Sequence, residues 1–314
     1  MKDNLFSNSI KKVTSPLPGS TPKAITYKLA VKKKYEGLNI IAFFNIAVPR
    51  STPTIWIDKV NDGNLKVNGK NITTAYLVKG GDVTMHQSEP KIEPPVSTNI
   101  NCIYNDDEII VLNKPSPLPV HASGRFVRNT LIHILSLAFP NENFKLLHRI
   151  DANTTGLIVL AKNKKAASFI QQQFENKTIK KIYIALVDGI VTENNLNLQQ
   201  SIGTEVLVGG ARKVDENGKL SQTEIEVIER RENNTLLKVA PLTGRTNQIR
   251  LHLAELGHPI VGDLGHKDIN YFKSNPFTYK TDSLFLHAHQ ITFKHPTLNK
   301  EMTFIAPIPK KFNA

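Results

Sequence analysis

The chain has almost no cysteine: of its 314 residues, only Cys102 carries a thiol. A single cysteine excludes an intramolecular disulfide and makes a cysteine-based zinc site untenable. It also fits a reducing compartment, so we expect a cytoplasmic protein. No apolar run approaches the roughly 18–20 residues needed to cross a bilayer, and the first twelve residues lack the apolar core of a secretory signal. The sequence therefore predicts neither membrane insertion nor secretion.

Acidic residues are also scarce, with 27 Asp and Glu against 40 Lys and Arg, for a net charge of +13. This excess predicts a polyanionic partner, with nucleic acid first and an anionic membrane surface second. A merely solvated basic surface fits the composition equally well. The excess is concentrated in residues 1–40, with a net charge of +6, and in residues 162–181, with +5.

Composition divides the chain into four parts. Residues 1–24 are basic and, for the most part, rich in Ser, Thr and Pro, and predict a flexible tail. Residues 25–88 contain an apolar run and an Asn-Gly turn, as expected of a small α/β domain. Residues 89–98 hold three prolines and predict a linker. Residues 99–314 are expected to form one larger domain.

Alternating and amphipathic patterns predict the elements of the larger domain. Helices are expected over 130–139, 164–174 and 246–256, and strands over 107–112, 156–161, 181–187, 223–229 and 284–293. In the last helix, Thr246 is the expected N-cap and Gly257 the stop. Many separated strands with intervening helices predict an α+β fold, a mixed and largely antiparallel sheet flanked by helices.

The densest group of chemically capable residues lies between two apolar runs and includes His148, Arg149, Asp151 and Thr154. Asp151 falls in a turn just before a strand expected to be buried. A carboxylate there needs a cation or several hydrogen bonds. The alternative is a turn aspartate that caps backbone amides.

Two further segments carry candidates. Arg245 and Arg250 bracket the start of a predicted helix, where an arginine can pair with a buried carboxylate or face solvent. Tyr183 lies in an alternating strand, a position typical of core packing. His287 and His289 alternate on a strand, but no cysteine or carboxylate nearby completes a metal set, so we expect no metal.

Several of these segments together resemble a known family. In order along the chain they are NDDEIIVLNKPSPLPVHASG, HRIDANTTGLIVLAKN, KKIYIALVDG, GKLSQTEIEVIE, PLTGRTNQIRLHLAELGHPIVGD and LHAHQITFKHP. They are similar to the motifs of RluA-type pseudouridine synthases, over about residues 99–309. Residues 38–88 resemble, less strongly, the S4-type RNA-binding module, through VNGK and KGGD.

The resemblance implies isomerisation of uridine to pseudouridine in structured RNA, with large-subunit ribosomal RNA first and tRNA next. It implies Asp151 as the catalytic carboxylate, Tyr183 as the aromatic that stacks on the base and handles protons, and Arg250 as the partner of the aspartate. Such chemistry on an RNA base requires the nucleotide to leave the stack. The reaction consumes no water and involves no redox change, so the resemblance implies no cofactor and no metal. The expected substrate and RNA contacts are Arg149, His148, Ile249, Arg245, Asn247, Lys114 and Thr154. Asn247 departs from the family, which usually has histidine there.

The sequence is also compatible with two other functions. A non-catalytic RNA-binding or assembly factor could be built on a retired synthase fold. A glycoside hydrolase would need a second carboxylate near Asp151, for which Asp263 is the one candidate. In each case we expect no obligate protein partner and a monomer.

Overall fold

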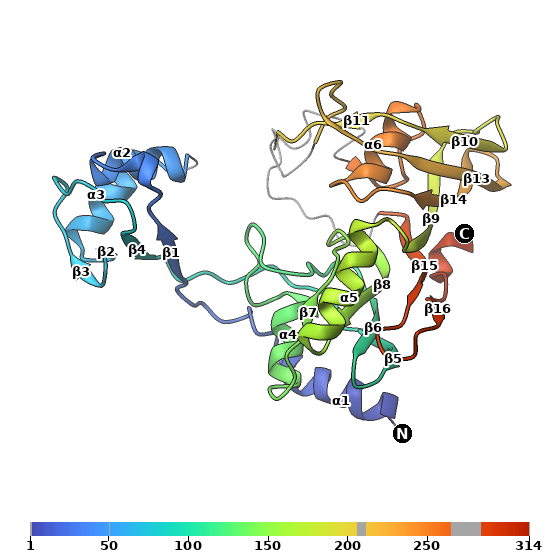
Figure 1. The fold of residues 1–314 in the computed structure, drawn as a ribbon, viewed down its shortest axis with the longest axis horizontal. Helices are drawn as coiled ribbons and strands as arrows, with labels where there is room; N and C mark the ends of the chain where they lie inside the picture. Colours follow the sequence, from blue (N-terminus) through green and yellow to red (C-terminus); the bar gives the residue numbers. More distant parts are fainter. Residues whose placement is uncertain (1, 50, 206–211, 265–283, 314) are drawn as a thin grey trace. The chain divides into compact units, whose positions relative to one another are not determined.

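Figure 1 shows the fold in a computed structural model, which describes residues 2–49, 51–205, 212–264 and 284–313. The chain divides into two compact units: unit 1 comprises Met1–Pro18 and Pro94–Ala314, and unit 2 comprises Gly19–Glu93. The second boundary falls inside the Pro-rich segment 89–98. In the described ranges, no helix has the length and apolar character needed to cross a membrane.

The helices and strands of unit 1 are, in chain order, α1 (Lys2–Thr14), β5 (Asn101–Asn105), β6 (Ile109–Lys114), α4 (Leu131–Ala138), β7 (Lys145–Leu146), β8 (Thr155–Ala161), α5 (Lys164–Glu175), β9 (Lys180–Asp188), β10 (Asn195–Leu198), β11 (Ser201–Ile202), β12 (Lys219–Leu220), β13 (Thr223–Arg230), β14 (Asn234–Pro241), α6 (Gln248–Glu255), β15 (Leu286–Lys294), β16 (Glu301–Ile305) and the 3-10 helix Lys310–Asn313.

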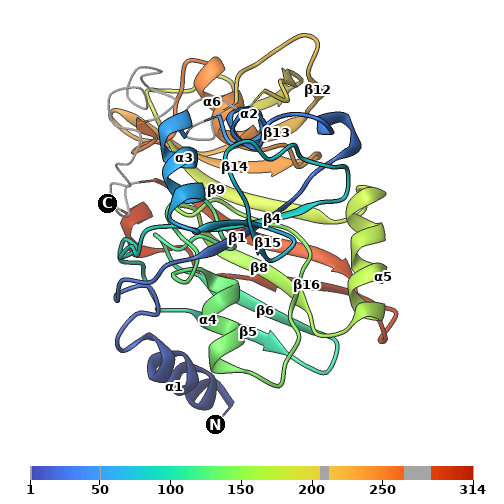
Figure 2. The same ribbon diagram turned by 90° about the vertical axis from the view of Figure 1, so that its left-hand side faces the viewer.

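Unit 1 is built on a ten-stranded sheet with the order β10-β13-β14-β9-β15-β8-β6-β5; β16 pairs with β15 and β7 with β8. Figure 2 shows the strands in this order from β5 to β13. Neighbouring strands are antiparallel except for β15 and β8, which run parallel. The predicted mixed, largely antiparallel sheet flanked by helices is therefore confirmed.

The central strands β6 and β8 are buried on both faces. Ile158 joins the core shared with α1 and α4, whereas Val159 joins the core shared with α5. Because alternate side chains of a strand point to opposite faces, helices on both sides make all seven residues of β8 buried. This arrangement holds β8 firmly, and with it the segment just before it, which contains Asp151.

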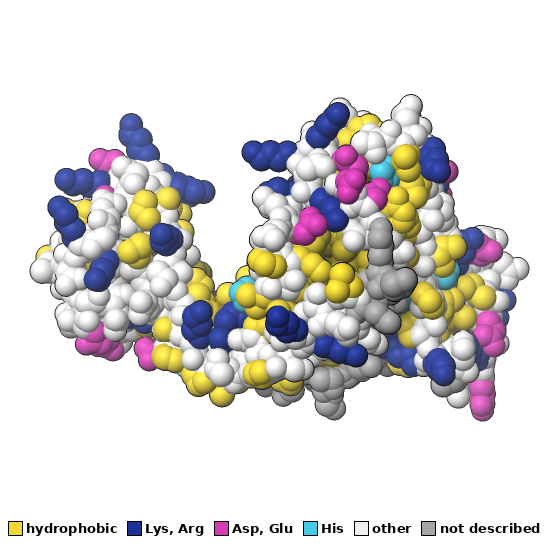
Figure 3. Space-filling view, turned by 90° about the horizontal axis from the view of Figure 1, so that it is seen from below, with side chains coloured by type: hydrophobic (Ala, Val, Ile, Leu, Met, Phe, Trp, Pro, Cys, Tyr) yellow, Lys and Arg dark blue, Asp and Glu magenta, His cyan; other side chains and the backbone are white. Residues whose placement is uncertain are grey.

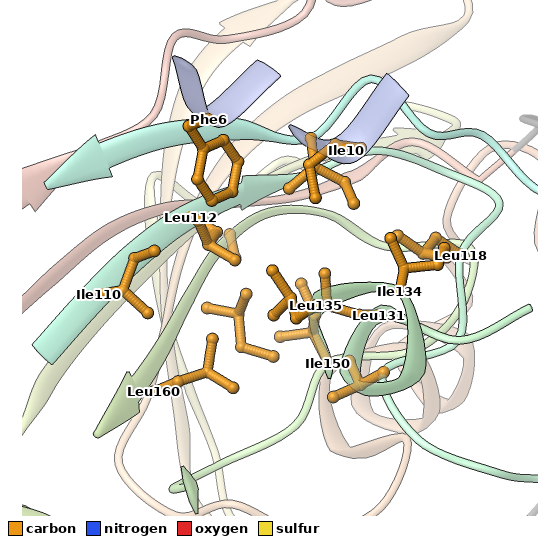
Figure 4. Packing of buried hydrophobic residues seen from close by; sticks show 14 residues of the cluster. Phe6, Ile10, Ile110, Leu112, Leu118, Leu131, Ile134, Leu135, Ile150 and Leu160 are labelled. Atoms are coloured by element: carbon orange, nitrogen blue, oxygen red, sulfur yellow. The ribbon is translucent and has the colours of Figure 1, made fainter. Parts of the chain in front are cut away.

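The N-terminal segment differs from its prediction. The expectation of a flexible tail over residues 1–24 is wrong for residues 2–14, which form α1. Phe6 and Ile10 are buried against α4 and β6, and Phe6 stacks on Phe139 with ring centroids 5.2 Å apart. Figure 4 shows both side chains pointing into this core. An apolar pair four residues apart thus outweighs the polar composition of the segment.

The start of α6 also differs from its prediction. The helix begins at Gln248, and its N-cap is Asn247 instead of the expected Thr246. Asn247 has φ 58°, in the left-handed region that asparagine tolerates better than most residues. The chain therefore makes a sharp turn directly before the helix.

Unit 2 is a small α/β unit with its own core. Its elements are β1 (Thr26–Ala30), the 3-10 helix Lys33–Tyr35, α2 (Ile40–Ala47), α3 (Pro53–Asn61), β2 (Leu65–Val67), β3 (Lys70–Asn71) and β4 (Val83–Gln87), with sheet order β1-β4-β2-β3. Phe44 of α2 stacks on Trp56 of α3 at 4.2 Å. Asn68 and Gly69 both have positive φ and join β2 to β3, as the Asn-Gly pair predicts.

Candidate active site

A cleft of about 510 Å³ opens in unit 1. Its walls come from five parts of the chain: residues 147–151 and Thr154 before β8, the end of α5 with the following loop, the first half of β9, residues 241–250 leading into α6, and Leu286 of β15. A volume of this size is typical of small-molecule sites, which span about 300–1,000 Å³. The fold thus brings the candidate segments of the sequence into one cavity.

Asp151 lies in a tight turn at the wall of this cleft. Its backbone carbonyl accepts a hydrogen bond from the amide of Thr154 at 3.1 Å, and the next carbonyl, of Ala152, accepts one from Leu118 at 2.9 Å. The side chain of Asp151 is 31% exposed, so one carboxylate oxygen can be held by the protein while the group still faces the cavity. The predicted position of this carboxylate, in a turn before a buried strand, is what the structure shows.

Arg250 holds two carboxylates at once. Its Nη1 donates to Oδ2 of Asp151 at 3.0 Å. Its Nε and Nη2 donate to the two oxygens of Asp263 at 2.7 and 2.8 Å. This second contact is the bidentate pairing that the planar guanidinium favours. Burial alone would lower the pKa of Arg250, but the hydrogen bonds and charges of Asp263 and Asp151 raise it, so the guanidinium is always charged.

Asp263 is a structural partner and does not form a catalytic acid pair with Asp151. It is 2% exposed, both its oxygens accept from Arg250, and it is absent from the lining of the cleft. A glycoside hydrolase needs two carboxyl groups that both face the sugar. Asp263 does not provide the second one.

Tyr183 lies in β9, in the middle of the sheet, opposite Val239 of β14 and Ala288 of β15. Its ring packs against two of the hydrophobic cores, and the residue also lines the cleft with Asp151. Burial, together with the negative charge of Asp151, raises the pKa of its hydroxyl above the usual value of 10. The hydroxyl therefore stays protonated at neutral pH, beside the carboxylate.

Gln248 fixes the turn before α6 and could not be recognised in the sequence. Its Oε1 accepts from Thr243 Oγ1 at 2.7 Å and from the amide of Arg245 at 3.0 Å, and its Nε2 donates to Gln222 O and Thr223 Oγ1. A buried amide with every group satisfied is rigid. This network sets the direction from which Arg250, two residues later, enters the site.

The remaining predicted contact residues differ in their surroundings. Arg149, Arg245, Asn247, Ile249 and Thr154 all line the cleft. Arg149 is exposed, whereas Ile249 and Thr154 are buried. Asn247 also accepts a hydrogen bond from Arg250 Nη1 at 3.3 Å. These five residues thus line the same cleft as Asp151, and their contact with RNA stays a prediction.

The position of Lys114 contradicts its predicted role. Predicted to contact RNA, it is completely buried, and its Nζ donates to the carbonyls of Pro115, Leu118 and Ala152 at 2.8, 2.9 and 3.1 Å. Burial lowers its pKa to about 7, against the opposing effect of the Asp151 charge. Because its three donors are used by the backbone, Lys114 ties the Pro-rich loop to the Asp151 turn and does not reach the RNA.

His148 lines the cleft but is also anchored to the sheet. Its Nε2 accepts the backbone N–H of Val159 at 3.0 Å, and its ring lies against Phe174 with centroids 5.2 Å apart. Burial, and then the charge of Lys181, lowers the pKa of His148 to about 3, so the ring is neutral. The described residues contain no cluster of His, Cys, Asp and Glu able to hold a metal ion.

Comparison with known proteins decides the family. A model of the RNA pseudouridylate synthase family matches residues 108–255. Ribosomal large subunit pseudouridine synthase C of Vibrio parahaemolyticus is 36% identical over 267 residues, covering 80% of this chain and 83% of that protein. The chain belongs to the RluA-type RNA pseudouridine synthase family. It is accordingly an RNA-modifying isomerase, and the expectation drawn from the motifs is confirmed.

Other relatives agree with this family. Ribosomal large subunit pseudouridine synthase C of Buchnera aphidicola is 34% identical, covering 81% of this chain and 84% of that protein. Among solved structures, human RNA pseudouridylate synthase domain containing 1 superposes with a TM-score of 0.56 at 28% identity, over 68% of this chain and 86% of that one. The pseudouridine synthase fold of unit 1 therefore rests on both sequence and structure.

Proposed function

We propose that this pseudouridine synthase converts one or more uridines of large-subunit ribosomal RNA to pseudouridine, with Asp151 as the catalytic carboxylate. The ribosomal substrate is supported by the names of the relatives from Vibrio and Buchnera. The single observation that carries the assignment of Asp151 is its 3.0 Å contact with Arg250 inside the cleft. Asp151 is a carboxylate in the lining that is both partly exposed and held by a largely buried cation, Arg250.

The reaction rearranges bonds within one nucleotide. The bond between N1 of the base and C1′ of the ribose breaks, the base turns, C5 bonds to C1′, C5 loses its proton and N1 gains one. A base inside a stacked helix cannot undergo these steps, so the nucleotide leaves the stack and enters the cleft. The carboxylate of Asp151 acts at the sugar, where it can serve as nucleophile or base.

The residues around Asp151 each have a role in the proposed reaction. Arg250 keeps the carboxylate charged and aimed, because a charge-assisted hydrogen bond favours the ionised form. Tyr183 offers a flat face for the base and a protonated hydroxyl for proton handling. Ile249 supplies an apolar wall, and Arg149, which is exposed at the rim, can fill the space left by the departed nucleotide.

Unit 2 is proposed as an S4-like RNA-binding module. Its 75 residues, Gly19–Glu93, carry eleven basic and six acidic side chains, a net charge of +5. Figure 3 shows lysine and arginine side chains projecting from its surface, with only a few acidic ones among them. Such a surface contacts phosphates and raises RNA affinity without selecting a sequence.

The proposal is tested by mapping pseudouridines in the RNA of cells that lack the gene. We expect one or a few pseudouridines to disappear from large-subunit ribosomal RNA and to return when the wild-type gene is restored. Loss from tRNA alone would contradict the ribosomal substrate. An unchanged map of both RNAs would contradict the activity and favour a non-catalytic RNA-binding role.

A further inference from the structure

Lys181 is a basic side chain of the cleft that the proposed reaction does not use. It lies in β9 two residues before Tyr183, and both residues line the cavity. Alternate residues of a strand point to the same face and are about 7 Å apart. Lys181 and Tyr183 therefore form adjacent positions on one wall of the cleft.

Lys181 is half-buried, and its ammonium group makes few polar contacts. Among the described residues, its one hydrogen bond is a long one, 3.4 Å, to the carbonyl of Thr243. Within the described ranges it forms no ion pair with a carboxylate, and His148 beside it is neutral. Partial burial lowers the pKa of Lys181 with no opposing charge. A cation that has lost part of its water and has no partner is costly unless a ligand provides the missing anion.

The other lysines of this basic region are placed differently. Lys162 pairs with Glu142 at 3.4 Å, and Lys180 pairs with Glu301 at 3.8 Å on an exposed surface. Lys164, Lys165 and Lys177 are exposed to solvent. Charge on such side chains attracts RNA in general. Lys177 also lines the cleft, but it is exposed, whereas Lys181 is half-buried in the cleft wall and pairs with no carboxylate among the described residues.

The residue next to Lys181 in the cleft wall, Gly244, has no side chain. A methyl group added there would stand 3.9 Å from Nζ of Lys181, which is its one neighbour within 4 Å apart from the adjoining residues. No side chain of residue 244 therefore covers the ammonium group on that side. In an RNA substrate the only anionic groups are the backbone phosphates, and within a nucleotide the ribose separates the base from its phosphates. A base against Tyr183 thus leaves a phosphate within reach of the neighbouring position on the strand.

We propose that Lys181, beside Gly244, binds one backbone phosphate adjoining the uridine that enters the cleft. This inference rests on the proposed function, because it assumes that the nucleotide lies between Asp151 and Tyr183. Lys181 would then hold the target nucleotide by its backbone while Asp151 acts on the sugar. A phosphate contact of this kind does not depend on sequence, so it acts on the flipped nucleotide whatever bases flank it.

The test uses the full-length enzyme and synthetic RNA fragments that carry the mapped uridine. A neutral methylphosphonate replaces the phosphate on either the 5′ or the 3′ side of that uridine, and kcat/KM is measured for each fragment. For the wild type, one of the two replacements should lower kcat/KM by about ten- to a hundredfold, the range of a charge-assisted hydrogen bond. For Lys181→Gln, kcat/KM on natural RNA should already be lower, and the same replacement should have little further effect.

The matched control is Lys180→Gln, which removes the neighbouring lysine on the opposite, exposed face of the strand. It should keep the full sensitivity of the wild type to the methylphosphonate. An equal loss in the wild type and in Lys181→Gln would overturn the inference, and so would a wild type that tolerates both replacements. The test of both replacements on the wild type needs no variant, so it remains valid even if Lys181→Gln folds poorly. A wild type that fails on unmodified RNA would contradict the proposed function itself.

Discussion

At the scale of single residues, the site depends on how Arg250 is held. Two of its nitrogens are taken by Asp263, which leaves Nη1 for Asp151. Asp263 is almost completely buried, so this clamp is shielded from water and salt. If Asp151 is the catalytic carboxylate, as proposed, Asp263 is a positioning residue that acts through Arg250 without lining the cleft.

Asp263→Asn should therefore impair catalysis more than RNA binding. An asparagine oxygen can accept from only part of the guanidinium fork and carries no charge, so Arg250 is free to turn away from Asp151. We expect the single-turnover rate to fall about tenfold or more, with an unchanged Kd for RNA. The free energy of unfolding should fall by about 3 kcal/mol, as for a broken buried ion pair.

The control for this experiment is Glu255→Gln at the exposed end of α6, which should change neither the rate nor the stability. A folded Asp263→Asn enzyme with the wild-type rate would show that the clamp is unnecessary. Restoration of the rate by Asp263→Glu would support a role of charge in the clamp.

His148 predicts a pH dependence of stability. Unfolded, its ring takes up a proton below about pH 6.5, whereas in the fold burial lowers its pKa to about 3. The unfolded state thus binds more protons between these pH values, and the free energy of unfolding falls as the pH drops from 6.5 to 3. At pH 4 this residue accounts for a loss of about 3 kcal/mol relative to neutral pH.

His148→Gln should reduce that loss, because an amide oxygen can still accept the N–H of Val159 but does not titrate. The measurement is urea denaturation at pH 4 and pH 7. Exposed His121, replaced by glutamine in the same way, should leave most of the difference between the two pH values intact. An unchanged difference in His148→Gln would contradict the lowered pKa of the His148 ring.

Residue roles were predictable only to a limited degree. Spacing along the chain left Asp151, Tyr183 and Arg250 each with a purely structural alternative, and the family resemblance singled them out. Arg250 and Asp151 are 99 residues apart, so their contact depends on the tertiary fold. The clamp by Asp263 and the network around Gln248 have no pattern in the sequence, because a buried polar group is recognised only by its partners.

At the scale of elements, α1 is an integral part of unit 1. Its Ile10 is 2% exposed within the core formed with α4 and β6, whereas Leu5 on the same helix is 71% exposed. The two residues have side chains of equal size and the same helical setting. They differ in burial, so comparing their substitutions distinguishes the contribution of core packing from that of helix propensity.

Ile10→Ala should therefore lower the free energy of unfolding of the full chain by about 2–4 kcal/mol, the usual effect of emptying a buried aliphatic site. Leu5→Ala should change it by less than about 0.5 kcal/mol. Denaturant unfolding of both variants makes the comparison. Equal effects would contradict the packing of α1 against unit 1.

Elements with a strong periodic pattern were predicted well. The buried strand at 156–161 and the helix at 164–174 correspond to β8 and α5 within a residue. The helix α1 was missed because the Ser, Thr and Pro content of the first 24 residues concealed its short apolar stripe. The start of α6 was misplaced because Asn247 adopts a left-handed conformation that no local pattern required.

At the scale of the whole molecule, unit 2 is an insertion in unit 1. Its first and last residues adjoin, because the amide of Glu93 donates to the carbonyl of Gly19 at 2.9 Å. Nearby, the backbones of Lys23 and Lys91 exchange a pair of hydrogen bonds at 3.4 and 3.3 Å. Each unit also has its own hydrophobic core. If unit 2 is deleted, a short linker can therefore join the two parts of unit 1 that flank it.

Replacing residues 20–92 by two glycines should leave unit 1 folded, with a cooperative thermal transition. RNA affinity should fall, and so should its dependence on salt, because the removed residues include most of the positive charge of unit 2. Filter binding at several salt concentrations measures both. A folded variant with wild-type affinity and salt dependence would contradict RNA binding by unit 2.

The division of the chain into two units was only partly predictable from the sequence. The Pro-rich segment 89–98 marked the second boundary of unit 2, because proline and scarce apolar residues show where a core ends. The first boundary, at residue 18, depends on α1 packing back onto unit 1, a long-range contact that composition does not report.

The proposed role of Asp151, isomerisation of a uridine held in the cleft, is tested most directly by Asp151→Asn, which keeps the size of the side chain and removes its charge. Purified wild type and variant are compared for RNA binding and for pseudouridine formed in the mapped fragment. RNA affinity should stay close to that of the wild type, and no pseudouridine should be detectable. Full turnover by Asp151→Asn would contradict the catalytic role of Asp151.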